Sequence, residues 1–153
     1  MIGIEVVGLK AVLQSIDKLN KDKIKKFKHV GVVGVRDILK HFRESQGQAG
    51  KWQKSLRGGK PLQKTGALQQ SITEHIHSDD RVEVGTNIKY GRIHNFGGVI
   101  KPKTKKYLSF PIGQSWVKVK KVDMPQREFL WLSREADSNM TKVLTDSWRE
   151  LTK

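Results

Sequence analysis

VEVGTNIKYGRIHNFGG, residues 82–98, joins two kinds of periodicity within one short stretch. Val82 and Val84 alternate with a polar residue, which is the pattern of a strand with one buried face. From Ile88 to Phe96 the sequence predicts a helix of one to two turns, and Gly97 and Gly98 end it in the way helices commonly stop. A strand that leads directly into a short helix indicates a mixed fold.

On the amino-terminal side, the sequence predicts a short strand followed by two helices. The strand is expected at Ile2–Val7, and apolar residues recur at helical spacing over Leu9–Leu19 and again over Lys21–Ser45. Gly31 and Gly34 would each weaken an isolated helix by about 1 kcal/mol relative to alanine. A helix that keeps both is expected to pack closely against another part of the backbone.

Between the second helix and residue 82, the sequence predicts a loop, a helix and a hairpin. Gln46–Lys64 has no period and is rich in glycine, glutamine and lysine, which favours a long loop. Thr65 is the predicted cap of a short helix from Gly66 to about Ile72. TEHIHS and RVEVGT, on either side of residues 79–80, predict a β-hairpin over Thr73–Thr86.

After residue 98, a lysine-rich arm is expected over 99–106, followed by YLSFPIG and SWVKVKKV as an antiparallel pair around Gly113. Pro125 ends the sheet, and Arg127–Leu132 is apolar again. Ser133 is the predicted N-cap of the last helix. The predicted fold is α+β: a small antiparallel β-sheet packed with a long N-terminal helix pair and a C-terminal helix. We expect one domain, 1–153, with loop 46–64 and arm 99–106 as extensions ordered by partners.

Composition limits the class of protein. The 153 residues include 36% hydrophobic residues and carry a net charge of +15, with a pI near 10.1. Cysteine is absent, so the chain has neither a disulfide framework nor a thiolate metal site. No apolar run approaches the roughly 20 residues of a membrane helix, and the start lacks the features of a secretory signal. A cytoplasmic origin and no membrane partner are expected.

The positive charge is concentrated in two tracts without acidic residues, between Glu44 and Glu74 and between Glu83 and Asp123. Such tracts favour a polyanionic partner, for which nucleic acid is the usual case. The alternative is that they are solvated loops that lysine keeps soluble, but two separate tracts in one small domain favour a surface near a DNA or RNA backbone. The candidate residues facing nucleic acid are Lys51, Lys54, Arg57, Lys60, Lys101, Lys103, Lys105 and Lys106.

Catalytic and metal chemistry find little support in the sequence. His75 and His77 share a strand face, but a metal site there would need residues 79–80 or His94 as further ligands, and no zinc-module spacing occurs. IHNF invites comparison with HNH nucleases, but the second histidine is missing. Neither a nucleophile elbow nor a phosphate-binding loop occurs. We expect no enzyme, no cofactor and no metal, and a structural or interface role for His94.

Three motifs in order resemble a known family. The first runs from Phe42 through Trp52 to LQKTGALQQSI, the second is VEVGTNIKYGRIHNFGG, and the third is MPQREFLWLS, where proline and arginine precede an apolar strand and the final helix. Together they look like the phage virion morphogenesis (tail completion) family typified by the G protein of phage Mu and related to the S proteins of P2-like phages. The resemblance covers roughly Ile38–Leu151. The chain departs from it at Gly91, where family members commonly carry alanine.

The resemblance implies a structural virion protein of the head–tail neck or the tail end, assembled in the host cytoplasm. It implies a homo-oligomeric ring, such as a hexamer or dodecamer, in contact with neck, connector or tail-tube proteins and with DNA passing through. The alternatives are a soluble basic nucleic-acid-binding module and, with less support, a metal-dependent nuclease. The structural or interface motif comprises Trp52, Gly66, Leu68, Tyr90, His94, Phe96, Gly97, Arg127 and Phe129.

Overall fold

A computed structural model describes residues 9–55, 58–77 and 81–151 of the chain. Its main element is α1, Leu9–Glu44, a helix of 36 residues and therefore about 54 Å long. The prediction of two helices with a break near residue 20 was wrong. No proline or glycine stands there to end the helix, so the two apolar stripes belong to one rod. The predicted strand Ile2–Val7 lies outside the described residues.

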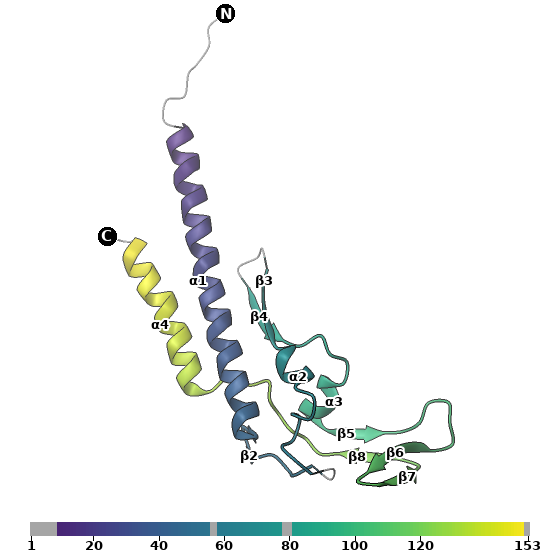
Figure 1. The fold of residues 1–153 in the computed structure, drawn as a ribbon. Helices are drawn as coiled ribbons and strands as arrows, with labels where there is room; N and C mark the ends of the chain where they lie inside the picture. Colours follow the sequence, from purple (N-terminus) through teal and green to yellow (C-terminus); the bar gives the residue numbers. More distant parts are fainter. Residues whose placement is uncertain (1–8, 56–57, 78–80, 152–153) are drawn as a thin grey trace, which may run out of the picture.

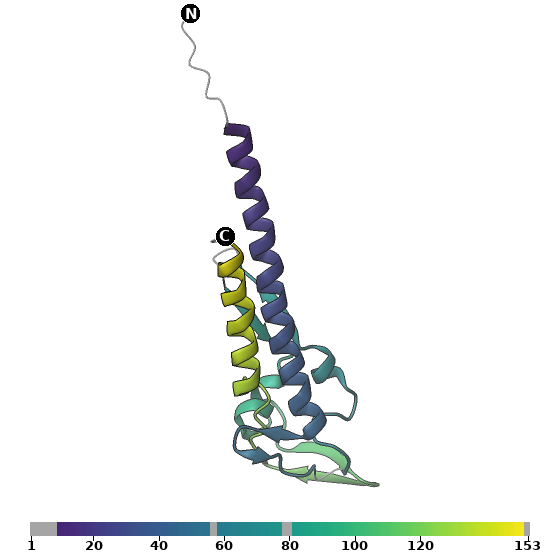
Figure 2. The same cartoon turned by 90° about the vertical axis from the view of Figure 1, so that its left-hand side faces the viewer.

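The last helix, α4 at Arg134–Leu151, lies beside α1 and runs in the opposite direction (Figures 1 and 2). The predicted cap is confirmed: the N–H of Ala136 donates to Ser133 Oγ at 3.1 Å. α4 is half as long as α1, and the first turns of α1 extend beyond the end of α4 (Figure 1). No helix within the described ranges is both long and apolar enough to cross a membrane.

The strands form four separate two-stranded antiparallel ladders in the described chain, rather than one small sheet. The fold class, α+β, is confirmed. β1 and β2 make a minimal turn after α1, β3 and β4 form the predicted hairpin, and β6 and β7 form the predicted pair around Gly113. The ladder between β5 and β8 was not predicted, because its strands are 21 residues apart in the sequence. The bounds are β1 Gln46–Gly47, β2 Gly50–Lys51, β3 Thr73–Ile76, β4 Val82–Gly85, β5 Gly98–Ile100, β6 Leu108–Ile112, β7 Ser115–Val119 and β8 Val122–Met124.

Two short helices connect these ladders: α2 at Ala67–Gln70 and α3 at Gly91–Phe96. α2 begins after Gly66, whose φ of 71° is left-handed, so Gly66 takes the N-cap position that we had predicted for Thr65. Thr65 Oγ1 still accepts a long hydrogen bond of 3.4 Å from the N–H of Ala67. Both helices therefore form where predicted, with shorter bounds.

The core is small and lies at the carboxyl-terminal end of α1. Phe42 and Phe129 are completely buried, and the Phe42 ring meets Trp52 edge-on at 5.6 Å and Phe129 at 5.1 Å between centroids. Ile38, Leu68 and Ile72 complete the buried cluster. The core thus joins α1, the loop after it, α2 and the segment before α4.

The glycines of α1 allow the β3–β4 hairpin to lie against that helix, as predicted. A Cβ on Gly31 would come within 2.7 Å of Glu74 Cβ on β3, and one on Gly34 would come within 3.1 Å of Val84 Cγ2 on β4. An alanine at position 31 would force Glu74 to shift, and one at position 34 would require Val84 and Met140 to give by a few tenths of an ångström. The close approach places the hairpin against α1, and at Gly34 the side chains of Val84 on β4 and Met140 on α4 both come near the helix.

Candidate interaction site

The motif helix α3 turns one aromatic face to solvent. The Tyr90 ring, at the N-cap of α3, meets the His94 ring edge-on at a centroid distance of 5.9 Å. Two residues further on, the Phe96 side chain is 67% exposed. Phe96 lies on another side of α3 from the Tyr90–His94 pair, because it lines a pocket with Lys89 and Arg92. The two exposed aromatic side chains are each available to contact another molecule.

His94 is half-buried on the same face as Tyr90 and holds no proton-relay partner within the described structure. Its Nδ1 is buried without a hydrogen bond. Burial lowers the pKa of His94, and the positive charge of Arg127 lowers that pKa further. The ring is therefore neutral at physiological pH and contributes mainly packing against Tyr90.

The opposite face of α3 holds the segment before α4 in place. Asn95 is 3% exposed, and its Oδ1 accepts the backbone N–H groups of Phe129 at 3.0 Å and Leu130 at 2.9 Å. The carbonyl of His94 accepts the N–H of Arg127 at 2.8 Å. The apolar stretch Arg127–Leu132 is therefore extended but is not the sheet strand we expected. Side-chain and helix-end acceptors satisfy its N–H groups where a neighbouring strand otherwise would.

Two further buried groups attach loop 46–64 to the same segment. Arg127 Nε donates to the carbonyl of Gln53 at 3.1 Å, and Trp52 Nε1 donates to the carbonyl of Glu128 at 3.0 Å. The first part of the loop is thus fixed by its own chain. Of the motif residues, Trp52, Leu68, Arg127 and Phe129 are buried, whereas Tyr90 and Phe96 remain accessible.

An open pocket of about 380 Å³ lies along one side of α3, from Lys89 to Gly97. Lys89 and Arg92 supply its charge, and Ile93, Phe96 and Gly97 its apolar wall. Gly97 has a φ of 70°, and a Cβ there would lie 2.9 Å from the backbone N of Gln126. This position therefore requires glycine. A pocket with two cationic side chains and an apolar wall is suited to bind an acidic side chain that stands next to an apolar one.

The lysine-rich tract follows directly. The side chains of Lys101, Lys103, Lys105 and Lys106 are all exposed, and Lys106 Nζ lies 5.7 Å from the centroid of the Tyr107 ring. β5–β8 and β6–β7 form an arm that projects sideways from the carboxyl-terminal end of α1 (Figure 1). Within it, Trp116 on β7 is 72% exposed, a feature that the sequence analysis did not single out.

The second basic tract lies at the same end of the molecule (Figure 1). Lys54 and Lys60 are exposed, and Lys51 Nζ, also exposed, donates to the carbonyl of Glu44 at 2.9 Å. Arg57 lies outside the described residues. The fold thus brings two tracts far apart in the sequence to one end, where their positive charges reinforce one another.

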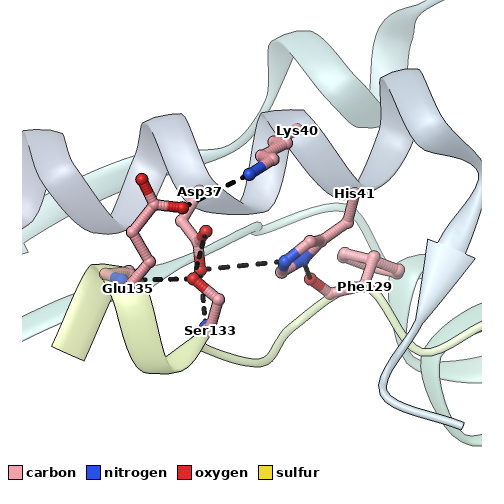
Figure 3. A network of polar contacts seen from close by, with 7 residues as sticks. Asp37, Lys40, His41, Phe129, Ser133 and Glu135 are labelled. Carbon is pink, nitrogen blue, oxygen red and sulfur yellow. Dashed lines mark hydrogen bonds and ion pairs between the residues drawn. The ribbon is translucent and has the colours of Figure 1, made fainter.

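A buried polar network, which the sequence analysis also missed, joins α1 to the start of α4 (Figure 3). Asp37 accepts from Ser133 N at 2.7 Å and from Ser133 Oγ at 2.8 Å. His41 Nδ1 donates to the carbonyl of Phe129 at 3.2 Å, and its Nε2 faces the Asp37 carboxylate at 3.7 Å. The signal was present, since Asp37 and His41 stand one turn apart beside the apolar residues of α1.

This Ser–Asp–His combination lacks the geometry of a catalytic triad. The serine hydroxyl donates to the aspartate rather than to the histidine, and the same oxygen accepts from the N–H of Ala136. Lys40 Nζ pairs with Glu135 at 3.4 Å alongside (Figure 3). The network therefore fixes the first turn of α4 on α1.

The candidate metal histidines face each other on the β3–β4 hairpin. The His75 and His77 rings meet edge-on at 4.6 Å, and His77 Nε2 lies 3.0 Å from Glu83 Oε2. His77 lowers the pKa of Glu83, first through a hydrogen bond and then through its charge. His94 belongs to α3, outside this hairpin. Within the described residues no group of three or more His, Cys, Asp or Glu could hold a metal ion.

The chain is similar to proteins of phage particles. A model of the phage virion morphogenesis family matches residues 40–148. Over 103 residues the chain is 31% identical to the Mu-like prophage FluMu G protein 2 of Haemophilus influenzae, an alignment that covers 67% of this chain. The chain spans 62% of the length of that relative. No solved structure matches the chain.

Proposed function

The chain belongs to the phage virion morphogenesis family, and on this basis we propose that it is a non-enzymatic structural protein of the phage particle. Its place is the head–tail neck or the tail end, where it completes the tail or joins it to the head. The observation that carries this proposal is the family match over residues 40–148, which includes the core apart from Ile38, together with α3, the arm and most of α4.

The shape of the chain supports a homo-oligomeric ring, such as a hexamer or dodecamer. The core is confined to one end of α1, while the arm and the first turns of α1 extend away from it (Figure 1). Two-stranded hairpins such as β6–β7 are only marginally stable alone in water. An arm of this kind gains stability when a neighbouring subunit or another neck or tail protein packs against it.

The position of the charge supports a passage for DNA. The exposed lysines of both basic tracts lie at one end of the molecule (Figure 1). The second tract has no acidic residue between positions 84 and 122. In a ring these lysines would form a repeated positive surface. Such a surface contacts phosphates without reading sequence, which is what a DNA channel requires.

The proposal is tested by deleting the gene in a phage or prophage that carries it and examining the particles by electron microscopy. Loss of the protein should leave separate heads and tails or unfinished tails, and expression from a plasmid should restore complete particles. Mass spectrometry of purified particles should detect the chain in a fixed number of copies. Complete, infectious particles in its absence would refute the proposal.

A soluble nucleic-acid-binding module is the second candidate, favoured by the exposed, acid-free lysine tract. It predicts that the isolated chain binds DNA with an affinity that falls steeply with salt. Reversing the charges of Lys103, Lys105 and Lys106 to glutamate should then reduce binding strongly. Glutamate at Lys18, Lys21 and Lys25, which are exposed on α1, provides a control of equal charge.

A further inference from the structure

A second apolar recess lies on the body of the protein, away from the arm. It is a groove of about 220 Å³ between α1, β4 and the start of α4. Val30, Val84, Trp131, Leu132 and Met140 are among its lining residues, all of which are apolar. Leu132, on its edge, is 47% exposed. An apolar cavity of about 150 Å³ can take a benzene molecule, so this groove is large enough for one aromatic side chain.

The same chain carries an aromatic side chain of matching size on its arm. Trp116 is 72% exposed on β7, opposite Pro111 of β6, and Lys118 lies two residues further on the same face. Exposed tryptophans are frequent anchors of protein interfaces, where each can bury 150–250 Å². Trp116 is the most exposed of the large hydrophobic side chains described.

Charge favours the groove of a second copy as the place for this arm. Residues 84–122, which include the whole β6–β7 hairpin, contain no acidic residue. The edge of the groove formed by α4 carries the exposed Asp137, three residues before the lining residue Met140 and therefore its neighbour on the helix surface. The β6–β7 hairpin lies in the arm, at the far end of α1 from the N-terminus (Figure 1). β4 and α4 lie further along α1, so the groove of the same copy is not beside Trp116's hairpin (Figure 1).

We propose that Trp116 of one copy inserts into this groove on the next copy, with Lys118 placed near Asp137. This inference rests on the proposed ring and identifies one contact within it. The two surfaces differ, so the contact is heterologous: each copy offers a tryptophan to one neighbour and a groove to the other. Contacts of this kind continue from copy to copy until the ring closes.

Cross-linking tests the contact directly, because the chain has no cysteine of its own. Lys118→Cys and Asp137→Cys introduce one thiol beside the tryptophan and one beside the groove, and both positions are exposed. Each variant is treated with a short bis-maleimide alone and after mixing with the other. The proposal predicts covalent dimers in the mixture and few in either variant alone. Gln14→Cys, exposed on the far end of α1, replaces Asp137→Cys as the control.

A second substitution tests the role of the tryptophan. Adding Trp116→Ala to Lys118→Cys should reduce the dimer yield about tenfold or more, as expected for an interface anchor. The fold should not change, because this side chain is exposed, and circular dichroism checks that it does not. A yield no higher than that of the Gln14→Cys control, or one that Trp116→Ala leaves unchanged, overturns the contact.

Two other outcomes are distinct and also overturn the proposal. Dimers of Lys118→Cys alone would indicate a symmetric contact between two arms. A loss of single-stranded DNA binding on Trp116→Ala, with unchanged cross-linking, would assign the tryptophan to base stacking. Either result leaves the proposed virion role intact, because that role is tested separately by gene deletion and particle analysis.

Discussion

Replacing Asn95 by alanine should destabilise the protein more than any exposed substitution on α3. A single oxygen, Oδ1, accepts the N–H groups of Phe129 and Leu130 at 3.0 and 2.9 Å. Asn95 is 3% exposed and Phe129 is fully buried, so water cannot easily replace the lost acceptor. A buried donor left without a partner costs about 1–3 kcal/mol. Two such donors cost roughly 2–6 kcal/mol, a large part of the 5–15 kcal/mol typical of a whole domain.

Urea unfolding followed by far-UV circular dichroism measures this cost as a fall in the free energy of unfolding. Arg92→Ala is the matched control, since Arg92 is exposed on the same helix and its substitution should change stability by less than about 0.5 kcal/mol. Hydrogen exchange adds a local readout, because the amides of Phe129 and Leu130 should exchange faster in the Asn95→Ala variant. A loss below about 1 kcal/mol, with those amides still protected, would refute the role of Asn95.

Three further substitutions test other parts of the site. Burial lowers the pKa of His94, so as the pH falls the unfolded chain takes up a proton near pH 6.5, before the folded protein does. The free energy of unfolding should therefore fall as the pH drops below about 6.5. His94→Gln should flatten that part of the profile when urea unfolding is measured at several pH values. Gly97→Ala places a side chain at a positive φ and against the backbone, so it should lower the free energy of unfolding by at least about 1–3 kcal/mol in thermal or urea unfolding. Gly113→Ala is the control: its φ of 59° is also positive, but the space around it is open, so the loss should be smaller. Asp37→Ala leaves two donors of Ser133 unpaired and should lower the free energy of unfolding by about 2–4 kcal/mol. The amides in the first turn of α4 should then exchange faster. Unchanged exchange there would contradict the role of Asp37 in holding α4 on α1.

The sequence predicted those elements whose signal is local. The β3–β4 and β6–β7 hairpins each lie within one short stretch of alternating residues, and the Ser133 cap depends on a side chain three residues from its donor. The Tyr90–His94 contact also follows from spacing along a helix. In these cases neighbouring residues alone decide the conformation.

Two failed predictions were local, the break near residue 20 in α1 and the N-cap of α2. The other failures concern interactions between residues far apart in the sequence. The β5–β8 ladder joins two strands of three residues each, too short for a pattern within either strand to identify its partner. The segment Arg127–Leu132 has the composition of a strand, but Asn95 on α3 supplies acceptors that a ladder would otherwise provide. The spacing of Asp37 and His41 along α1 was visible in the sequence, but their partners were not, because these lie about ninety residues further along the chain.

These long-range contacts also show how a force on the arm would reach the helices. The arm begins at Gly98 and ends at Met124, next to the two points where α3 and the segment 127–130 are hydrogen-bonded together. That segment continues into Ser133, which Asp37 of α1 holds through two hydrogen bonds. The path from arm to helix pair therefore contains buried, paired groups and no long free linker. A partner that docks on the arm would fix the direction of α1 and α4 as well, so contacts between arms and bodies around a ring would set the tilt of every helix pair at once.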